Sequence, residues 1–290
     1  MKDYFGYKDK ICVVTGAASG MGKSTTEMLV ELGAKVYALD WNEVEIEGIE
    51  EFIKVNLSEK NSIDEAFSLI PLTIDSFFGI AGVSGVKTDF NTTVIIDFLA
   101  NKYISENYLV QRMSQGSAIA FITSTGGLGW EKEDNKKEYM PLIEAKTWEN
   151  TITTLEELDL NGLPGPLGYL FAKLAMNYYV AFLQTIFTKK HIRVNAVLPG
   201  STETGMVDEF SHAAGGTDNL LKHTGYAGRL AASREMGEPV VFLNSNMASF
   251  ISGELLVVDY GTNLLTQAGI HEDPMGGATF AKYKSHILNK

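Results

Sequence analysis

The sequence predicts an α/β fold in which a doubly wound parallel sheet forms one domain over residues 1–290. Short apolar runs alternate with helical patterns along most of the chain. A glycine-rich turn follows the first apolar run, and an acidic residue ends the second. With 290 residues, 45% of them hydrophobic, the chain is long enough for one large core.

The first predicted unit has the order strand, glycine-rich turn, helix, strand. It consists of a strand at Ile11–Val14, a turn at Thr15–Gly22, a helix that Gly33 ends and a strand at Ala34–Leu39. Small turn residues let the backbone approach a pyrophosphate, and the helix N-terminus supplies N–H groups and the positive end of its dipole. The residues expected to bind it are Gly16, Ser19, Gly20, Met21 and Gly22.

Asp40 follows the second strand and indicates which dinucleotide binds. Its carboxylate can accept hydrogen bonds from both hydroxyls of an adenosine ribose and repels a 2′-phosphate. The predicted cofactor is therefore NAD(H). The alternative is a tight turn that serves only the packing of the helix on the strand.

Composition excludes several other classes of protein. The net charge is −12 and no basic cluster is present, so we expect no nucleic-acid partner. The single cysteine, Cys12, lies in a predicted strand, so no disulfide framework is expected, and we predict no metal site. The first ten residues lack an apolar core of a signal peptide, and no long apolar run is found; we expect a cytoplasmic protein without a membrane partner.

Five more strands complete the predicted sheet, at 52–55, 74–81, 118–122, 192–198 and 255–258. Helices are predicted between them, at 59–69, 89–113, 168–188 and 238–243. Ligands of such sheets bind outside the carboxyl ends of the strands. The same rim should therefore carry Gly16, Asp40, Asn56, Ala81 and Ser124.

Two strand ends on this rim are expected to contact the dinucleotide. Asn56 and Leu57 lie where an adenine ring can rest. Ala81 and Gly82 are small enough for close approach of a ligand.

Three segments do not follow the strand–helix alternation. Residues 128–166 are polar and charged and are interpreted as an insertion or lid, in which 141–160 could hold one or two short helices. Residues 201–226, rich in Gly, Ser, Thr and Asp, are predicted to be a flexible substrate loop. The tail at 266–290 is expected to wrap a surface or a neighbouring subunit.

Tyr169 and Lys173 are the candidates for chemistry. They are four residues apart and share one face of a predicted helix. An ammonium beside a phenol lowers its pKa, which otherwise lies near 10. Ser124, at a strand end, can hydrogen-bond a substrate oxygen. The three side chains predict a proton shuttle for alcohol–carbonyl interconversion with hydride transfer to or from a nicotinamide. Such a pair also occurs on ordinary helices.

These residues together resemble the short-chain dehydrogenase/reductase family, whose domain has a Rossmann-type fold, over nearly the whole chain. The matching motifs are Thr15–Gly22, Ala81-Gly82, Ser124, Tyr169-x-x-x-Lys173, Asn195, Pro199-Gly200 with Thr204, and Gly253 with Val258-Asp259. The resemblance implies that Ser124, Tyr169 and Lys173 are catalytic. It implies cofactor contacts from Ser19, Met21, Asp40, Leu57, Ala81, Gly82, Tyr169, Lys173, Pro199, Thr202 and Thr204.

Three positions depart from the family pattern. Gly79-Ile80-Ala81-Gly82 stands where the family usually has Asn-Asn-Ala-Gly, so one strand-bracing side chain is missing. Asn56 replaces an aspartate that is usual near the adenine. Asp97 aligns with the asparagine of the proton relay and is taken as the fourth catalytic candidate; it could hold the same water, or Asn101 could substitute.

The long segment between Ser124 and Tyr169 is similar to that of the bacterial 3α-hydroxysteroid dehydrogenase/carbonyl reductase subgroup. This similarity implies a steroid or bile-acid substrate, with the carbonyl on the ring or, in a 20β activity, on the side chain. Apolar residues of the two irregular segments either line such a pocket or pack the insertion onto the body of the protein: Trp130, Leu163, Met206, Val207 and Phe210.

Two other functions remain open at this point. A small ketone, sugar or polyol fits the same chemistry. A catalytically inactive nucleotide-binding scaffold is the third hypothesis, because Asp97 is a carboxylate at the position of the relay amide. The family resemblance also implies a homo-oligomer, a dimer or a tetramer, although the insertion precedes the helix that is often used for pairing.

Overall fold

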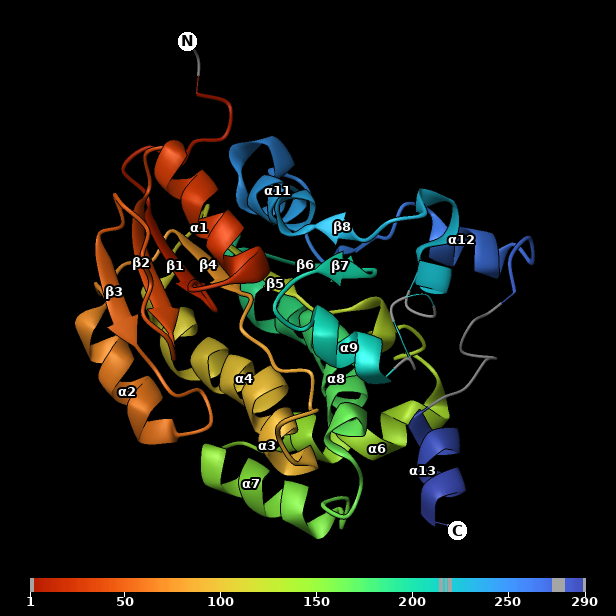
Figure 1. Cartoon of the computed structure of the whole chain (residues 1–290). Helices are drawn as coiled ribbons and strands as arrows, with labels where there is room; N and C mark the ends of the chain where they lie inside the picture. Colours follow the sequence, from red (N-terminus) through yellow and green to blue (C-terminus); the bar gives the residue numbers. More distant parts are fainter. Residues whose placement is uncertain (1–2, 214–215, 217, 219–220, 273–279, 289–290) are drawn as a thin grey trace.

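The computed structural model describes residues 3–213, 216, 218, 221–272 and 280–288. At its centre lies a seven-stranded sheet (Figure 1). Its strands are β1 (Ile11–Thr15), β2 (Lys35–Asp40), β3 (Glu51–Lys54), β4 (Ser76–Gly79), β5 (Ala118–Ile122), β6 (Arg193–Pro199) and β9 (Leu255–Val258).

All neighbouring strands of this sheet are parallel, and their order is β3-β2-β1-β4-β5-β6-β9. The chain proceeds outward from β1 to β3 and then returns to β4 on the other side of β1. Helices that follow β1 and β4 therefore leave in opposite directions, and a crevice opens at the carboxyl ends of these two strands.

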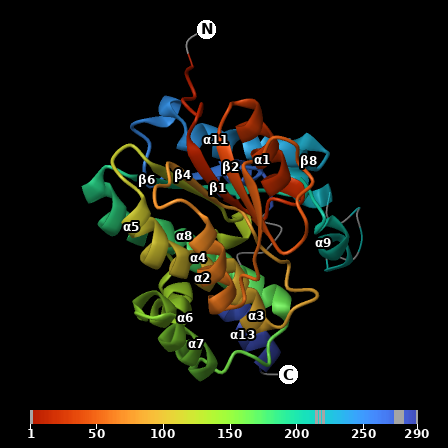
Figure 2. The same ribbon diagram turned by 90° about the vertical axis from the view of Figure 1, so that its left-hand side faces the viewer.

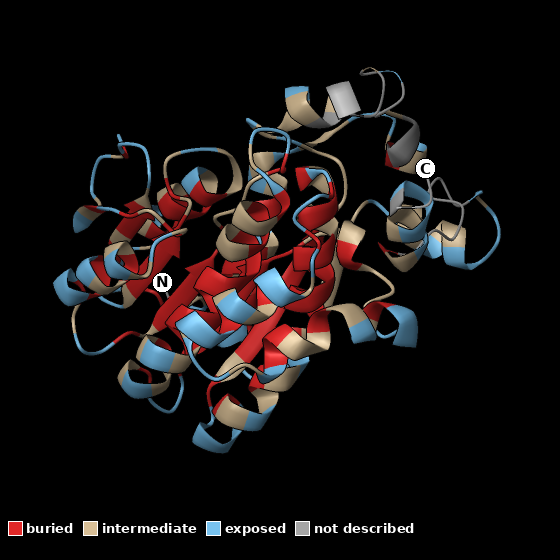
Figure 3. Ribbon diagram, turned by 90° about the horizontal axis from the view of Figure 1, so that it is seen from below, coloured by how far each residue is buried: buried red, intermediate tan, exposed pale blue. Residues whose placement is uncertain are grey.

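Two layers of helices cover the sheet (Figure 2). On one face lie α1 (Gly20–Glu31) and α11 (Ser233–Asn244), which pack against each other. On the other lie α2 (Lys60–Leu69), α8 (Gly165–Phe187) and the long helix that follows β4. Each face buries its own apolar cluster, and Figure 3 shows the buried residues on the strands and on the inner sides of the helices.

The long helix contains two π-helical turns. It runs through α3 (Phe90–Val94), α4 (Ala100–Ile104) and α5 (Val110–Arg112), with π turns at Ile95–Leu99 and Ser105–Leu109. Asp89 caps its start, since its side chain accepts a hydrogen bond from the Thr92 N–H. The first π turn contains Asp97 and packs against α8. A π turn inside a helix often marks a functional position.

The insertion folds into α6 (Glu133–Glu144) and α7 (Trp148–Glu157), and α6 starts before the predicted helical stretch. These helices lie outside α8 and the long helix as a third layer (Figure 2). The buried Lys102 ammonium fastens this layer, because it donates to the carbonyl of Ala145 and pairs with Glu106. The insertion thus covers helices of the body.

The tail prediction can be followed over 266–272 and 280–288; residues 273–279 and 289–290 lie outside the described part. Helix α13 (Phe280–Leu288) packs on α6 and α8 of its own chain. Phe280 is 2% exposed and contacts the rings of Phe90 and Phe171. The Lys284 ammonium lies 2.8 Å from a carboxylate oxygen of Glu138 on α6.

The predicted substrate loop contains ordered elements in its described part. β7 (Thr202–Glu203) pairs with β8 (Ala231–Ala232), α9 (Val207–Ala213) follows β7, and a 3₁₀ helix spans Lys222–Ala227. Further short helices are α12 (Thr262–Gln267) and 3₁₀ turns at Thr125–Gly127, Thr188–Lys190 and Asn246–Ala248.

The predicted parallel α/β sheet is confirmed, and all seven predicted strands are present. The helix predicted at 238–243 begins at Ser233 instead, so that Pro239 lies inside α11 and not in its first turn. Helix α8 with the turn after it is the one described helix long and apolar enough to cross a membrane; 61% of its most apolar stretch is buried, as in the core helix of a globular domain.

Candidate active site

The glycine-rich turn after β1 can close only because it lacks side chains. Gly16 has φ +75°, and a Cβ there would lie 2.8 Å from the N and Cα of Ala81. A Cβ at Gly22 would lie 1.9 Å from the Gly16 carbonyl oxygen. The first turn of α1 therefore packs directly on the loop, and the end of β4 packs on its other side.

The N-terminus of α1 faces the crevice without a capping side chain. Ser19 has an extended backbone at the N-cap position, and in the described structure its hydroxyl makes no capping bond. The first turn contains no acidic residue. Its N–H groups and the positive end of the helix dipole are therefore available to an anion.

Asp40, at the end of β2, accepts two backbone hydrogen bonds. Its Oδ2 lies 2.9 Å from the Ala18 nitrogen and its Oδ1 lies 2.8 Å from the Asn42 nitrogen. A carboxylate has about four lone-pair sites, so two acceptor sites remain. The carboxylate thus fixes the turn and can still accept both hydroxyls of a ribose.

A cavity of about 580 Å³ joins these features. Eleven of the predicted cofactor residues line it: Gly16, Ser19, Gly20, Met21, Gly22, Asp40, Asn56, Leu57, Ala81, Gly82 and Thr204. A bare helix N-terminus, an acidic strand end and small residues on one wall fit a dinucleotide. The cavity wall does not include Pro199, Thr202, Tyr169, Lys173 or Ser124.

Asn56 uses its side chain within its own loop. Its Oδ1 accepts hydrogen bonds from the N–H and the hydroxyl of Ser58, and its Nδ2 donates to Glu59 over 2.8 Å. Leu57 is buried and contributes an apolar surface to the same wall. Both residues line the cavity, and their contact with an adenine ring stays a prediction.

Ser124 and Tyr169 come together at Gly126, where a Cβ would lie 3.3 Å from the Ser124 Oγ and 3.8 Å from a ring carbon of Tyr169. Ser124 ends β5, and its Oγ accepts a hydrogen bond from the Gly126 N–H over 3.0 Å. Its hydroxyl also hydrogen-bonds the Tyr169 phenol at the start of α8. The predicted juxtaposition of strand end and helix is therefore present.

Lys173 lies one turn further along α8, with its Nζ 5.0 Å from the centroid of the Tyr169 ring. The same Nζ is 3.0 Å from Oδ2 of Asp97. Burial lowers the pKa of Lys173, but Asp97 and Tyr169 outweigh it and the net shift is upward, so the ammonium stays charged.

The pKa of the Tyr169 phenol differs from the expectation. Burial raises it, Lys173 and the bond with Ser124 lower it, and Asp97 raises it further, so the net shift is upward. The predicted effect of Lys173, a lower pKa for the phenol, is present, but burial outweighs it and the net shift is upward. Sequence reasoning omitted burial and gave Asp97 no charge effect on the phenol.

Asn101, the alternative relay residue, lies beside the end of β4. A Cβ at Gly79 would lie 2.7 Å from its Oδ1 and 2.5 Å from the ring of Phe121. Asn101 and Phe121 thus fill the space of the side chain that is missing from β4. Asp97 is the residue that contacts Lys173.

Pro199 and Thr202 lie beside the strand end that carries Ser124. Pro199 ends β6, and its carbonyl accepts a hydrogen bond from the hydroxyl of Thr125 over 3.1 Å. Thr202 lies in β7, and its hydroxyl donates to the carbonyl of Gly200 over 3.0 Å. Both residues stay near the site, outside the cavity wall described above.

Three residues of the site were missed in the sequence. Glu209 of α9 accepts a short hydrogen bond from the buried Ser84 hydroxyl and lies 2.6 Å from the Lys87 ammonium. All three line the cavity, with Met206 and Gly205 beside Glu209. These contacts join the substrate segment to the loop after β4, and no short-range sequence pattern links positions so far apart.

The apolar residues proposed for a steroid pocket have different places. Met206 lines the cavity, whereas the cavity wall includes neither Val207 nor any residue of 128–166. Leu163 is buried in the core, and Trp130 packs against Tyr178 of α8 with 6.2 Å between the ring centroids. The side chain of Phe210 lies outside the described residues.

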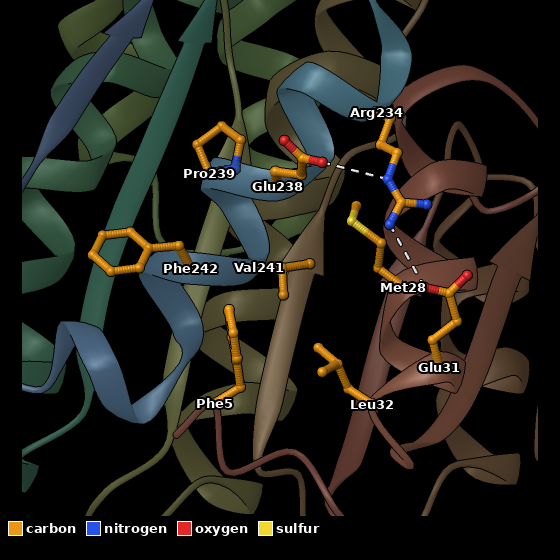
Figure 4. A pocket seen from close by; sticks show the side chains of 9 residues that line it. All are labelled: Phe5, Met28, Glu31, Leu32, Arg234, Glu238, Pro239, Val241 and Phe242. Carbon is orange, nitrogen blue, oxygen red and sulfur yellow. Dashed lines mark hydrogen bonds and ion pairs between the residues drawn. The ribbon is translucent and has the colours of Figure 1, made fainter. Parts of the chain in front are cut away.

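A second cavity, of about 530 Å³, lies between α1, α11 and the N-terminal segment (Figure 4). Its wall is mostly apolar, with Phe5, Leu32 and Phe242 among the side chains drawn. Among the described residues of its wall, Arg234 is the one cation, and it is already paired with Glu31 and Glu238. None of the predicted site residues lines it, so the first cavity is the candidate active site.

Comparison with known proteins gives the same class. Residues 10–129 match the family model described as short chain dehydrogenase, and residues 137–263 match the one described as Enoyl-(Acyl carrier protein) reductase. A coniferyl-alcohol dehydrogenase of Pseudomonas sp. (strain HR199 / DSM 7063) is 27% identical over 263 residues, which cover 87% of this chain and 96% of that protein.

Solved structures share the fold. The 3-alpha-hydroxysteroid dehydrogenase of Pseudomonas sp. B-0831, complexed with NADH, has a TM-score of 0.74 and 23% identity and covers 89% of this chain and 99% of its own. A protein of Agrobacterium tumefaciens with bound NADP has a TM-score of 0.68 and 19% identity over 91% of this chain and 100% of its own. With the sheet order and the site, these matches show that the chain belongs to the short-chain dehydrogenase/reductase family of oxidoreductases.

Proposed function

We propose that this oxidoreductase interconverts a secondary alcohol and a ketone with NAD(H) as its coenzyme. The observation that carries the proposal is the group of Ser124, Tyr169 and Lys173, whose lysine lies next to Gly82 in the wall of the cavity that the predicted cofactor residues line. When bound, the coenzyme supplies or accepts a hydride. Asp40 favours NAD(H), because its free lone pairs suit two ribose hydroxyls and its charge repels a 2′-phosphate.

Each catalytic candidate has a role that its position supports. Ser124 holds the substrate oxygen beside the phenol by a hydrogen bond. Tyr169 gives its proton to that oxygen when a ketone is reduced and takes it back when an alcohol is oxidised. Lys173 stabilises the phenolate that forms and can hydrogen-bond the nicotinamide ribose. Hydride and proton together account for the two electrons and two hydrogens of the reaction.

The proposed substrate is a steroid or bile acid with a ring or side-chain carbonyl. The long segment between Ser124 and Tyr169 supports this class by its resemblance to the 3α-hydroxysteroid dehydrogenase/carbonyl reductase subgroup. The fold likeness to a hydroxysteroid dehydrogenase agrees with it. A small ketone, sugar or polyol is the second candidate, because Ser84, Lys87 and Glu209 make one part of the cavity polar.

A coenzyme and substrate panel tests the proposal. We expect oxidation of NADH in preference to NADPH with keto-steroids, measured by the loss of coenzyme absorbance. Turnover of small ketones but not of steroids would replace the first substrate class by the second. A preference for NADPH would overturn the role of Asp40.

Tyr169→Phe is the decisive variant for the chemistry. Loss of the phenol should lower kcat by at least about 100-fold, the contribution of a positioned acid–base group, while NADH binding stays within twofold. Coenzyme fluorescence provides the binding control. If Tyr169→Phe keeps its activity, or if the wild type binds NADH and reduces no carbonyl compound, the inactive-scaffold alternative gains instead.

A homo-oligomer and a cytoplasmic location complete the proposal. Helix α6 occupies the outer side of α8, which leaves the other end of the sheet for pairing. There β9 is an edge strand with half-exposed residues, and Met247 and Phe250 beside it are exposed. This favours a dimer, which sedimentation of the purified protein would distinguish from a tetramer or a monomer.

A further inference from the structure

The lysine of the proposed proton shuttle has a carboxylate partner. Lys173 Nζ and Asp97 Oδ2 are 3.0 Å apart, and the two side chains are 6% and 0% exposed. Asp97 Oδ1 accepts a hydrogen bond from the Val83 N–H over 2.8 Å. The pair thus joins α8, the first π turn and the loop after β4 at the wall of the candidate active site.

The surroundings of the pair leave it little freedom to separate. A Cβ at Gly82 would lie 3.3 Å from both carboxylate oxygens of Asp97 and 3.4 Å from Lys173 Nζ. The Gly82 backbone therefore packs on both charged groups at once. Because a buried charge without a partner is costly, each group holds the other in its ionised form.

The pair changes the charge that the Tyr169 phenol experiences. Among the described residues, the charged groups that act on this phenol are Lys173, on its own helix, and Asp97, on the π turn packed against it; Ser124, from the end of β5, is neutral. The ammonium alone would favour the phenolate. The carboxylate opposes it and offsets part of the effect of Lys173 on the phenol, although burial contributes most to the net rise in the pKa.

We propose that Asp97 is a positioning residue that neutralises Lys173 and keeps Tyr169 in its phenol form at neutral pH. This inference rests on the proposed function, since it assigns Asp97 a role through Tyr169. An amide at position 97 could hold Lys173 in the same place but could not offset its charge. Asp97 therefore offsets the positive charge of Lys173 within the site.

The proposal determines the pH range in which each direction runs. Reduction of a carbonyl needs the phenol, which gives its proton to the oxygen while hydride adds to the carbon; the phenolate then regains a proton from solvent. Oxidation needs the phenolate, which takes the hydroxyl proton as hydride leaves. With the phenol stabilised, reduction keeps its full rate through neutral pH, and oxidation increases only at alkaline pH.

The supporting pKa directions agree with this arrangement. Burial and Asp97 raise the pKa of Tyr169 above its ordinary value, against Lys173 and Ser124. Burial also raises the pKa of Asp97, and the Lys173 ammonium and the Val83 N–H offset only part of that rise. The charge of Asp97 affects Tyr169 because the ion pair holds Asp97 beside Lys173, one helical turn from Tyr169.

The test compares Asp97→Asn with Asp89→Asn. Both variants remove one carboxylate from the same helix, but Asp89 is the N-cap and makes no contact with Lys173. We follow the rate as a function of pH with cyclohexanone and cyclohexanol as probes. For Asp97→Asn, we expect the alkaline limb of the rate profile for reduction and the acid limb of the profile for oxidation both to move to lower pH by roughly one unit. For Asp89→Asn, neither limb should move. Unmoved limbs in Asp97→Asn, or equal shifts in both variants, would overturn the inference.

A second measurement does not depend on turnover of these probes. The tyrosinate absorbance that is lost in Tyr169→Phe reports the ionisation of this phenol directly. Its midpoint should fall by the same amount in Asp97→Asn, and a constant midpoint contradicts the inference. If Asp97→Asn does not fold, the wild type still provides a test, because a Tyr169 midpoint at or below neutral pH would refute the role of Asp97.

Failure of the inference and failure of the proposed function give different results. If Tyr169→Phe retains turnover, the proposed chemistry is wrong. If Tyr169→Phe is inactive while the limbs and the tyrosinate midpoint of Asp97→Asn match the wild type, the chemistry stands and only the role of Asp97 is wrong.

Discussion

The Asp40 carboxylate combines a structural and a selective task in one side chain. It fixes the glycine-rich turn through the Ala18 N–H and still faces the cavity. Asp40→Ala should therefore raise the Kd for NADH at least about tenfold, the equivalent of one lost charge-assisted hydrogen bond. The same variant should bind NADPH more tightly than the wild type does, because the repulsion of the 2′-phosphate is gone. Fluorescence titration with both coenzymes measures these changes.

Asp40→Asn separates the two tasks. The amide keeps an acceptor for the Ala18 N–H but carries no charge, so it should relax the exclusion of NADPH while the turn stays intact. Dissociation constants that match the wild type for both coenzymes in both variants would remove Asp40 from the site.

For single residues, the sequence predicted their spacing on an element well and the charges around them poorly. The spacing of Tyr169 and Lys173 requires one helix face, and the structure has it. The contact of Lys173 with Asp97 depends on how far the long helix lies from α8. That distance is set by packing over the whole core, and no local motif contains it.

Helix α9 is joined to the opposite wall of the cavity by Glu209. Its carboxylate bonds the buried Ser84 hydroxyl and pairs with Lys87, so the substrate segment is tied to the loop after β4. Lys87 is largely exposed, and solvent screens its share of the attraction. The bond to Ser84 is therefore the stronger part of the tie.

Glu209→Gln tests this tie. The neutral amide loses the ion pair and weakens the bond to Ser84, so NADH should dissociate up to about tenfold faster. Stopped-flow fluorescence measures the rate. Asp208→Asn, an exposed neighbour on the same helix, is the matched control and should not change it. Equal rates in Glu209→Gln and the wild type would show that coenzyme release does not depend on this contact.

The tie also has a defined pH dependence. Hydrogen bonds from Lys87 and Ser84 lower the pKa of Glu209 below its ordinary value. A lowered pKa means that the charged form is favoured in the folded protein, so the tie is complete at neutral pH and is lost as the pH falls through that lowered value. The rate of NADH release should thus stay constant from neutral to mildly acidic pH.

Elements were predictable where one physical signal dominates. Short apolar runs bounded by turn residues gave the strands, because strands buried on both faces need no alternation. The two π turns have no such signal, and residues 89–113 fit an unbroken helix equally well. The start of α11 was placed too late, because Pro239 favours a first turn although it is also tolerated at this interior position.

At the scale of the molecule, the C-terminal helix closes the core beneath the insertion. Phe280 lies against Phe90 and Phe171, so α13 buries a ring between the long helix and α8. Phe280→Ala should lower the free energy of unfolding by about 3 kcal/mol, the usual cost of removing a buried phenylalanine ring. Thermal or urea unfolding of the variant measures this loss.

Ile287→Ala is the control on the same helix, since Ile287 is 37% exposed. It should change the free energy of unfolding by less than about 1 kcal/mol. A similar small effect in Phe280→Ala would mean that α13 detaches from the body before the core unfolds, and hydrogen exchange on α13 would then be fast in the wild type as well.

The overall architecture followed from the alternation of strands and helices, but the position of the insertion did not. Its polar composition was interpreted as that of an insertion or lid, whereas α6 and α7 form an outer layer on the helices. A segment with enough apolar residues to cover a helix has the same composition as one that covers a cleft. Which of the two it covers is decided by shape complementarity with distant residues.

The short ladder between β7 and β8 has a consequence for how new specificities arise. It fastens residues 202–203 to residues 231–232 at the base of the substrate segment, next to the end of the central sheet. Insertions, deletions and exchanges between these two anchor points therefore leave the coenzyme scaffold in register. Libraries that vary residues 207–230 but keep Glu209 should yield folded enzymes with altered substrate preferences.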